Sequence, residues 1–258
     1  MKLFVVSDVH SYLEPLKVAL DEAGFDPNNE DHWLVSCGDV FDRGPDSGLL
    51  WKFLMSLERK ILIKGNHDLL LDECCMREFP YNHDFSNGTV RTINDIGGAG
   101  EGYPFDTCCQ RTWNKLAAYR DLLINYFETE NYIFVHSWLP LKCLDKMPKH
   151  YVQNRQFEYD PEWRNATEDA WEQAMWGNPF DLATMGFNKT GKTIVFGHWH
   201  CSAGWAKDEG RSEFKDDAKW DIYRNPEQNI IAIDHCTAHT NKVHVLVLED
   251  NLLNKEGI

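Results

Sequence analysis

The stretch Gly38-Asp39-Val40-Phe41-Asp42-Arg43-Gly44 is the most informative part of this chain. It follows a short apolar run, Trp33 to Val35, and precedes a segment with helical periodicity that starts near Ser47. Its glycines let the backbone turn sharply and approach a ligand closely. Its carboxylates suit divalent cations, and the planar guanidinium of Arg43 can bind two phosphate oxygens at once. By itself the stretch also fits a salt bridge that braces a surface turn.

The size and composition indicate a globular α/β protein. The chain has 258 residues, of which 43% are apolar, and no linker or repeat divides it, so we expect a single domain over residues 1–258. No apolar run approaches the roughly 18 residues that span a bilayer. The N-terminal run Met1 to Val6 is too short for a secretory signal. We therefore expect a cytoplasmic protein without a membrane partner.

Charge and cysteine usage narrow the class further. The net charge is −15, and no cluster of Lys and Arg offers a surface for a nucleic-acid backbone, so general nucleic-acid binding is not expected. The eight cysteines include no CxxC spacing. In a chain without an export signal, this pattern favours free, buried thiols over disulfides or a structural zinc site.

Short apolar runs without strict alternation predict strands that are buried on both faces. The principal runs cover residues 3–6, 33–35, 61–63, 132–135 and 193–196. Residues 13–20 and 49–57 have helical periodicity, so strand and helix alternate as in βαβ units. Residues 229–233 and 242–248 predict two late strands, which we expect to pair antiparallel across a turn at 236–241.

The middle of the chain has a different composition. Residues 78–110 are rich in Gly, Asn, Asp and Pro, which predicts a mobile surface loop. Helices are expected over 113–125 and over 165–175, the latter with Asn165 as its N-cap. The dense mixed charge of 207–221 indicates a solvated face.

Metal-capable side chains follow the ends of all five principal strands. They are, in chain order, Asp8, His10, Asp39, Asp42, Asn66, His67, Asp68, His136, His198 and His200. In open α/β sheets ligands bind at the carboxyl ends of strands. A lone histidine such as His136 is more often a hydrogen-bonded structural residue, but five consecutive strand ends favour one shared site. Outside this pattern, and interpreted as structural or surface residues, are His32, His83, His150, His235, His239 and His244.

The donor set predicts the cofactor. It mixes nitrogen and oxygen ligands without thiolate, which suits two divalent ions, manganese first and iron or zinc as alternatives. Two such ions about 3.5–4 Å apart can hold a hydroxide between them and neutralise phosphate oxygens during in-line attack.

The motifs SDVH, GDVFDRG, GNHD, VH and GHWH, in this order, resemble those of the calcineurin-like metallophosphoesterase superfamily. The DRG ending is most similar to the phosphoprotein phosphatase branch, which includes Ser/Thr phosphatases and symmetrical diadenosine tetraphosphatases. Residues 174–179 and 231–234 resemble that branch more loosely, and the likeness extends from Ser7 to about Leu248. It implies an α/β fold, a four-layer α/β/β/α sandwich with mixed sheets and loop insertions.

The resemblance also implies a role for each site residue. One metal ion would be bound by Asp8, His10, Asp39 and His200, and a second by Asp39, Asn66, His136 and His198. His67 would be the general acid, oriented by Asp42, and Arg43 would clamp the phosphate.

The chain departs from the branch at several positions. Ser7 and Ser11 stand where glycines are usual, and His-Ser-Trp at 136–138 replaces HGG. No second phosphate-binding arginine matches, which leaves Arg155 and Arg164 as candidates. These differences leave the hydrolytic core intact and leave the substrate open.

We therefore expect a dinuclear metal-dependent phosphoesterase in which a metal-bound hydroxide attacks phosphorus directly. Its partner would be a phosphorylated protein, nucleotide or small molecule. Phosphate monoesters of the Ser/Thr-phosphatase type come first, dinucleoside polyphosphates such as diadenosine tetraphosphate second, and phosphodiesters third. A metal-binding scaffold without activity is the alternative from another class, and the intact His67, Asp42 and Arg43 argue against it because a scaffold needs no general acid.

Overall fold

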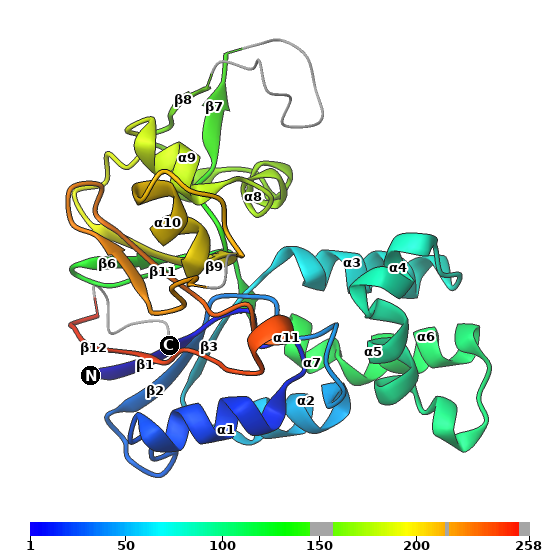
Figure 1. Ribbon diagram of the computed structural model, residues 1–258. Helices are drawn as coiled ribbons and strands as arrows, with labels where there is room; N and C mark the ends of the chain where they lie inside the picture. The colour runs from blue at the N-terminus through cyan, green and yellow to red at the C-terminus, as the bar shows by residue number, and fades with distance from the viewer. Residues whose placement is uncertain (145–156, 215–216, 253–258) are drawn as a thin grey trace.

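The computed structural model describes residues 1–144, 157–214 and 217–252. Figure 1 shows two sheets stacked on each other with helices on both outer faces. Three apolar clusters account for the stacking: one between the sheets and one between each sheet and its outer helices. The expected four-layer α/β/β/α fold is confirmed.

The first sheet is mostly parallel and has the order β12-β1-β2-β3-β4. Its strands are β1 (Lys2–Val6), β2 (His32–Ser36), β3 (Lys60–Ile63), β4 (Leu123–Ile124) and β12 (Leu246–Glu249). In β1, Leu3 and Val5 face the second sheet, whereas Phe4 and Val6 face the outer helices. Both faces are buried, which explains why the apolar run does not alternate. Helices α1 (Leu13–Glu22) and α2 (Ser47–Ser56) cover the outer face.

The second sheet is mixed and has the order β10-β11-β9-β6-β5. Its strands are β5 (Phe127–Glu128), β6 (Tyr132–Phe134), β9 (Thr193–His200), β10 (Tyr223–Asn225) and β11 (Ile230–Asp234). Its outer face packs on the buried Trp138 and Trp163 and on α8 (Glu168–Ala174), α9 (Pro179–Thr184) and α10 (Cys201–Asp208). A separate ribbon is formed by β7 (Leu141–Cys143) and β8 (Phe157–Tyr159).

The two late strands exist, but the expected antiparallel pair is wrong. β11 pairs parallel with β9 in the second sheet, and β12 pairs antiparallel with β1 in the first. The segment between them, expected as a turn, contains α11 (Thr237–Thr240) and carries the chain from one sheet to the other. Each strand therefore finds a partner far away in sequence.

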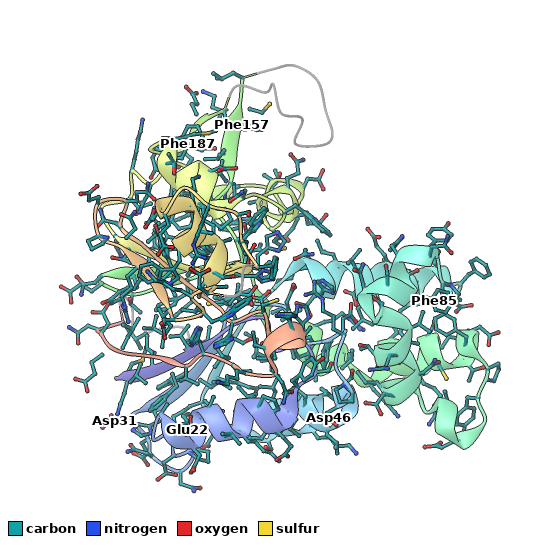
Figure 2. The ribbon with its side chains drawn as sticks, in the orientation of Figure 1. Glu22, Asp31, Asp46, Phe85, Phe157 and Phe187 are labelled. Carbon is teal, nitrogen blue, oxygen red and sulfur yellow. The ribbon has the colours of Figure 1, made fainter. Side chains whose placement is uncertain are left out.

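Residues 66–120 form a helical lobe beside the sandwich (Figure 1). It comprises α3 (Asn66–Arg77), α4 (Asn82–Asn87), α5 (Thr89–Gly97), η1 (Ala99–Glu101), α6 (Phe105–Lys115) and α7 (Ala117–Arg120). The prediction of a mobile loop over 78–110 is wrong, because Gly88 and Gly98 end short helices at positive φ. Ile93 of α5 is buried in the core, whereas Phe85 of α4 projects outward and is 61% exposed (Figure 2).

Two helix boundaries also differ from expectation. The helix expected over 113–125 begins earlier, at Phe105, and the chain enters β4 at Leu123. The helix expected over 165–175 is α8, whose N-cap is Thr167, because the Thr167 side chain accepts a hydrogen bond from the amide of Ala170. Asn165 instead ends a short 3₁₀ turn, η2 (Trp163–Asn165).

Seven cysteines are buried thiols, as expected: Cys37, Cys74, Cys75, Cys108, Cys109, Cys201 and Cys236. Among the described residues, no helix is both long and apolar enough to cross a membrane.

Candidate active site

The carboxyl ends of β1, β2, β3, β6 and β9 converge on one side of the sandwich, where the segments that follow them adopt unusual backbone conformations. Positive φ angles between 49° and 74° occur at Asp8, His10, Asp39, Asp42, Arg43 and His198. Each such residue costs about 1–3 kcal/mol unless its surroundings hold it, and this kind of strain concentrates at functional sites. Part of the folding free energy of the sandwich therefore offsets the backbone strain that places these side chains.

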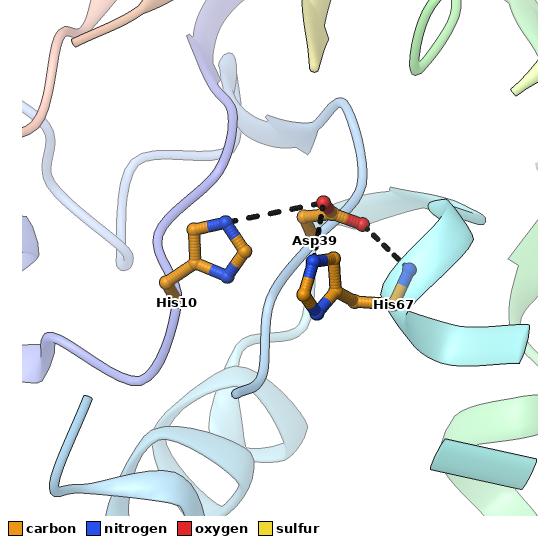
Figure 3. Close-up of side chains that lie close together, drawn as sticks. All are labelled: His10, Asp39 and His67. Atoms are coloured by element: carbon orange, nitrogen blue, oxygen red, sulfur yellow. Dashed lines mark hydrogen bonds and ion pairs between the residues drawn. The ribbon is translucent and has the colours of Figure 1, made fainter. Parts of the chain in front are cut away.

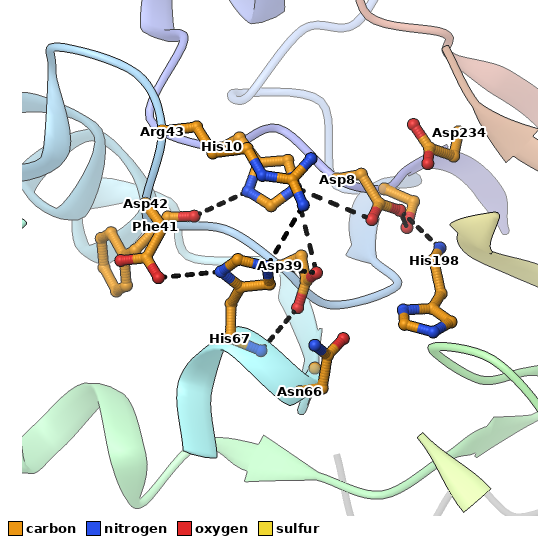
Figure 4. Close-up of polar contacts among 12 residues, drawn as sticks. Asp8, His10, Asp39, Phe41, Asp42, Arg43, Asn66, His67, His198 and Asp234 are labelled. Atoms are coloured by element: carbon orange, nitrogen blue, oxygen red, sulfur yellow. Dashed lines mark hydrogen bonds and ion pairs between the residues drawn. The ribbon is translucent and has the colours of Figure 1, made fainter. Parts of the chain in front are cut away.

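Asp39 lies at the centre of the cluster (Figures 3 and 4). Its Oδ2 is 3.9 Å from His10 Nε2 and 3.8 Å from His67 Nε2, and its Oδ1 is 3.5 Å from His136 Nε2. The amide of His67 donates to Asp39 Oδ1 at 3.0 Å. Burial works against the charged carboxylate, but the surrounding histidines outweigh it and hold the pKa of Asp39 well below its usual value. Asp39 is thus a buried anion shared by several imidazoles.

Two of these histidines have a fixed tautomer. His10 Nδ1 donates to the carbonyl of Phe41 at 2.9 Å, and His136 Nδ1 donates to the carbonyl of Cys37 at 2.8 Å. In a neutral imidazole this bond leaves the lone pair on Nε2, on the side of the carboxylates, which is how a metal-binding histidine is oriented.

Two groups of donor atoms that could each hold a metal ion share Asp39. The atoms of His10, Asp39 and His67 lie within 4.8 Å of one another, and so do those of Asp39, His136 and His198. Asn66 adds an oxygen ligand beside the second group, because its Oδ1 is 2.7 Å from His136 Nε2. Mixed nitrogen and oxygen donors of this kind suit manganese, iron or zinc.

Asp8 is held by neighbours that the sequence motifs do not explain. Its Oδ2 accepts hydrogen bonds from Ser7 Oγ at 2.5 Å and from the amide of His198 at 2.9 Å, and its Oδ1 is 4.0 Å from His10 Nε2. Ser7, which replaces a usual glycine, therefore orients a candidate ligand. Gly197 is required for this packing, because a Cβ there would lie 2.1 Å from Asp8 Oδ2.

His67, Asp42 and Arg43 are brought together beside this centre (Figure 4). His67 Nδ1 donates to Asp42 Oδ2 at 2.8 Å, and Arg43 Nη2 lies 3.4 Å from His67 Nε2. Burial acts to lower the pKa of His67, but the carboxylates of Asp39 and Asp42 outweigh it and raise that pKa above its ordinary value. The arrangement can therefore keep a proton on His67 near the exposed guanidinium of Arg43.

His200 lies apart from both groups of donor atoms. Its Nδ1 is 2.9 Å from Glu213 Oε1, and its Nε2 is 3.9 Å from Asp234 Oδ2. Neither carboxylate was singled out from the sequence as a site residue. Asp234 ends β11, so the strand-end argument would have found it had it been applied to this strand. Burial, with Asp8 nearby, raises the pKa of Asp234 to about 8.

A cavity of about 510 Å³ opens over the cluster. Residues that line it beyond the predicted set are Leu70, Glu73, His83, Asn87, Trp176 and Asp234. Trp176 is 48% exposed, and its ring lies 6.3 Å from that of His198. His83, assigned to the surface, also belongs to this wall. The candidate second arginine Arg164 is instead bonded to Glu128, and Arg155 lies outside the described residues, as does His150.

The sequence of this chain is similar to those of known proteins. A model of the family described as calcineurin-like phosphoesterase matches residues 1–202. The symmetrical bis(5'-nucleosyl)-tetraphosphatase of Pseudomonas fluorescens (strain SBW25) is 44% identical over 72 residues, which are 28% of this chain and 25% of that protein. The same-named protein of Pectobacterium atrosepticum is 40% identical over 72 residues, again 28% of this chain and 25% of that protein. The matched part thus spans about a quarter of the length of these curated relatives.

Solved structures share the fold. A protein provisionally described as a diadenosine tetraphosphatase superposes with a TM-score of 0.52 at 18% identity, covering 96% of this chain and 89% of that one. A cold-active protein-tyrosine phosphatase of a psychrophilic Shewanella gives a TM-score of 0.52 at 16% identity, covering 97% and 76%. At such identities the likeness concerns the fold alone.

Proposed function

The chain belongs to the calcineurin-like phosphoesterase family, and from this premise we propose that it hydrolyses dinucleoside polyphosphates of the diadenosine tetraphosphate type. As a member of that family it is a phosphoric ester hydrolase. One observation carries the choice of substrate: the curated relatives at 40–44% identity bear the name symmetrical bis(5'-nucleosyl)-tetraphosphatase. This reverses the order expected from the sequence motifs, which placed phosphate monoesters first.

The reaction is a displacement at phosphorus by water. One P–O bond of the central anhydride breaks, one P–O bond forms to water oxygen, and two nucleoside diphosphates result. When bound, two divalent cations supply positive charge that neutralises phosphate oxygens and activates water for in-line attack. The residues proposed to hold them are Asp8, His10 and Asp39 on one side and Asn66, His136 and His198, together with Asp39, on the other. His200 is the least secure of the expected ligands, because it is engaged by Glu213.

The remaining residues bind the phosphate and donate the proton. Arg43 lies at the cavity wall, where its exposed guanidinium can bind non-bridging oxygens. His67 is oriented by its Nδ1–H bond to Asp42, so that Nε2–H points to the reacting phosphate and donates its proton to the leaving oxygen. The negative charge of Asp42 stabilises the imidazolium before transfer.

Phosphate monoesters of the Ser/Thr type are the second candidate, on one observation. His67 and Asp42 form a buried, hydrogen-bonded pair that can donate a proton. A proton donor accelerates hydrolysis most when the leaving oxygen belongs to a poor leaving group, and the serine alkoxide of a phosphoserine ester is a poor leaving group.

The test is a substrate panel with purified protein and Mn²⁺. Diadenosine tetraphosphate, a phosphoserine peptide and bis-p-nitrophenyl phosphate are compared by kcat/KM, with products resolved by chromatography. We expect diadenosine tetraphosphate to be preferred and to give two molecules of ADP. A higher kcat/KM for the phosphopeptide would transfer the assignment to the second candidate, and no turnover of any of the three substrates by the metal-loaded protein would refute both.

A further inference from the structure

The carboxylate of Asp42 is fully buried and, within residues 1–144, 157–214 and 217–252, has no cationic partner of fixed charge. Among the described ion pairs its partner is His67 alone. Its other hydrogen bonds come from two hydroxyls of the helical lobe: Thr89 Oγ1 donates to Oδ2 at 2.7 Å, and Thr92 Oγ1 donates to Oδ1 at 2.9 Å. A buried carboxylate is costly unless such bonds satisfy it. The two threonine hydroxyls therefore donate the hydrogen bonds that an arginine or lysine could otherwise donate to this carboxylate.

The Thr92 hydroxyl belongs to a chain of hydrogen bonds whose direction can be worked out. Thr92 Oγ1 gives its only proton to the carboxylate, so it accepts from Ser47 Oγ at 3.2 Å and from the amide of Asp42 at 3.1 Å. Because Ser47 Oγ donates its only proton to Thr92 Oγ1, Ser11 Oγ, which lies 2.8 Å away, must donate to Ser47 Oγ. All three hydroxyl residues have 0% exposure. The chain runs one way, from Ser11 through Ser47 and Thr92 to Asp42.

The same part of the lobe also forms hydrogen bonds with the backbone of Arg43, the proposed phosphate clamp. The amide of Arg43 donates to the carbonyl of Asn87 at 3.1 Å, and Arg91 Nη1 donates to the carbonyl of Arg43 at 3.3 Å. Gly88 allows this contact, because a Cβ there would lie 2.3 Å from the amide nitrogen of Arg43. The start of α5 thus holds the backbone at positions 42 and 43, both of which have positive φ.

We propose that Thr89 and Thr92 are positioning residues for the general acid. They fix the plane of the Asp42 carboxylate, so that Oδ2 meets His67 Nδ1 and Nε2 is presented to the leaving oxygen. Without the two hydroxyls the carboxylate can rotate, and His67 loses its orientation. This inference rests on the proposed function, because it requires His67 to act as the acid.

The experiment separates positioning from folding by means of the leaving group. Thr92→Val and Thr89→Val remove the hydroxyl at nearly constant volume, whereas Thr92→Ser and Thr89→Ser keep it. Thr112→Val is the matched control: Thr112 is also 0% exposed and lies in the same lobe, but its hydroxyl donates to the carbonyl of Ile93. Each protein, loaded with Mn²⁺, is assayed with phenyl phosphate, a poor leaving group, and with 2,4-dinitrophenyl phosphate, a good one.

We expect Thr92→Val to lower kcat for phenyl phosphate about 10-fold or more, and kcat for 2,4-dinitrophenyl phosphate less than about twofold, since only the poor leaving group needs a positioned acid. The serine variants should restore activity, and Thr112→Val should resemble the wild type. In a His67→Asn background, Thr92→Val should have no further effect on phenyl phosphate.

The outcomes distinguish the two levels of inference. If His67→Asn loses activity selectively on phenyl phosphate but both valine variants match Thr112→Val, the positioning role is refuted and the proposed function stands. Equal losses on both substrates, without rescue by serine, would show a purely structural role and also refute it. A wild-type protein inert toward diadenosine tetraphosphate as well as toward both aryl phosphates refutes the proposed function first.

Discussion

Gly65 is the position where a single methyl group should do most harm to the site. It precedes Asn66 and packs against the central carboxylate, and a Cβ there would lie 2.2 Å from Asp39 Oδ1 and 2.4 Å from the Asp39 amide nitrogen. Because ordinary contact begins at 3.4 Å, Gly65→Ala must separate these atoms by about 1.2 Å. The obstacle includes backbone, so a rotamer change of Asp39 cannot relieve it.

The magnitude follows from the role of Asp39. A misplacement of about 1 Å in a catalytic constellation costs about 100-fold in rate, which is about 2.7 kcal/mol of transition-state stabilisation. We expect Gly65→Ala to lower kcat/KM about 100-fold and to weaken Mn²⁺ binding, measured by steady-state kinetics and by titration calorimetry. Overpacking should also cost about 1–3 kcal/mol of unfolding free energy, measured in urea.

The matched control is Gly100→Ala, at a glycine where an added Cβ meets nothing within 4 Å. It should behave like the wild type in all three measurements. Wild-type activity and Mn²⁺ affinity in folded Gly65→Ala would show that Asp39 is not held where this argument requires it.

Three further predictions concern charge and metal. Glu128 is bonded to Arg164 and Lys192; burial acts to raise its pKa, but these bonds outweigh burial and lower it. A carboxyl with a lowered folded pKa adds stability that is present above its unfolded pKa, near 4.3, and is lost as the pH falls through the folded value. Glu128→Gln should therefore lower the unfolding free energy by about 0.5–1 kcal/mol at pH 7, after allowance for the exposed Arg164, and the difference in urea midpoints should vanish in acid. Saturating Mn²⁺ at about 100 times its Kd should stabilise the wild type by about 2.7 kcal/mol, and Asp39→Asn should abolish this gain in thermal melts, whereas an unchanged gain would contradict a shared carboxylate. His200→Ala should still bind two Mn²⁺ per chain by elemental analysis, because His200 is engaged by Glu213; binding of one ion would instead restore the role implied by the motifs.

The metal-capable residues could be predicted from sequence because their placement follows from local order. A parallel strand delivers whatever follows it to the same edge as its neighbours, so Asp8, Asp39 and Asn66 converge once the strands are recognised. His136 follows β6 of the second sheet and joins them because the two sheets stack.

The helical lobe could not be predicted in the same way. The glycines that suggested a loop over 78–110 end helices instead, and composition alone does not separate the two uses of glycine. The late strands were misassigned for a related reason: neighbours in sequence commonly pair, and only the stacking of two sheets sends β11 and β12 to different ones. Thr89 and Thr92 reach Asp42 across 47 and 50 residues of chain, and no motif relates them.

This contrast suggests a division of labour within the molecule. The candidate metal ligands follow strand ends of the sandwich, with Asn66 at the first residue of α3. The support of the proton donor and of the phosphate clamp comes from the end of α4 and the start of α5. Positive φ at Asp42 and Arg43 is costly, and bonds from the lobe oppose that cost. His83 and Asn87 of the same lobe also line the cavity. A change at the end of α4 or the start of α5 is therefore expected to alter the orientation of the acid and the shape of the substrate pocket together.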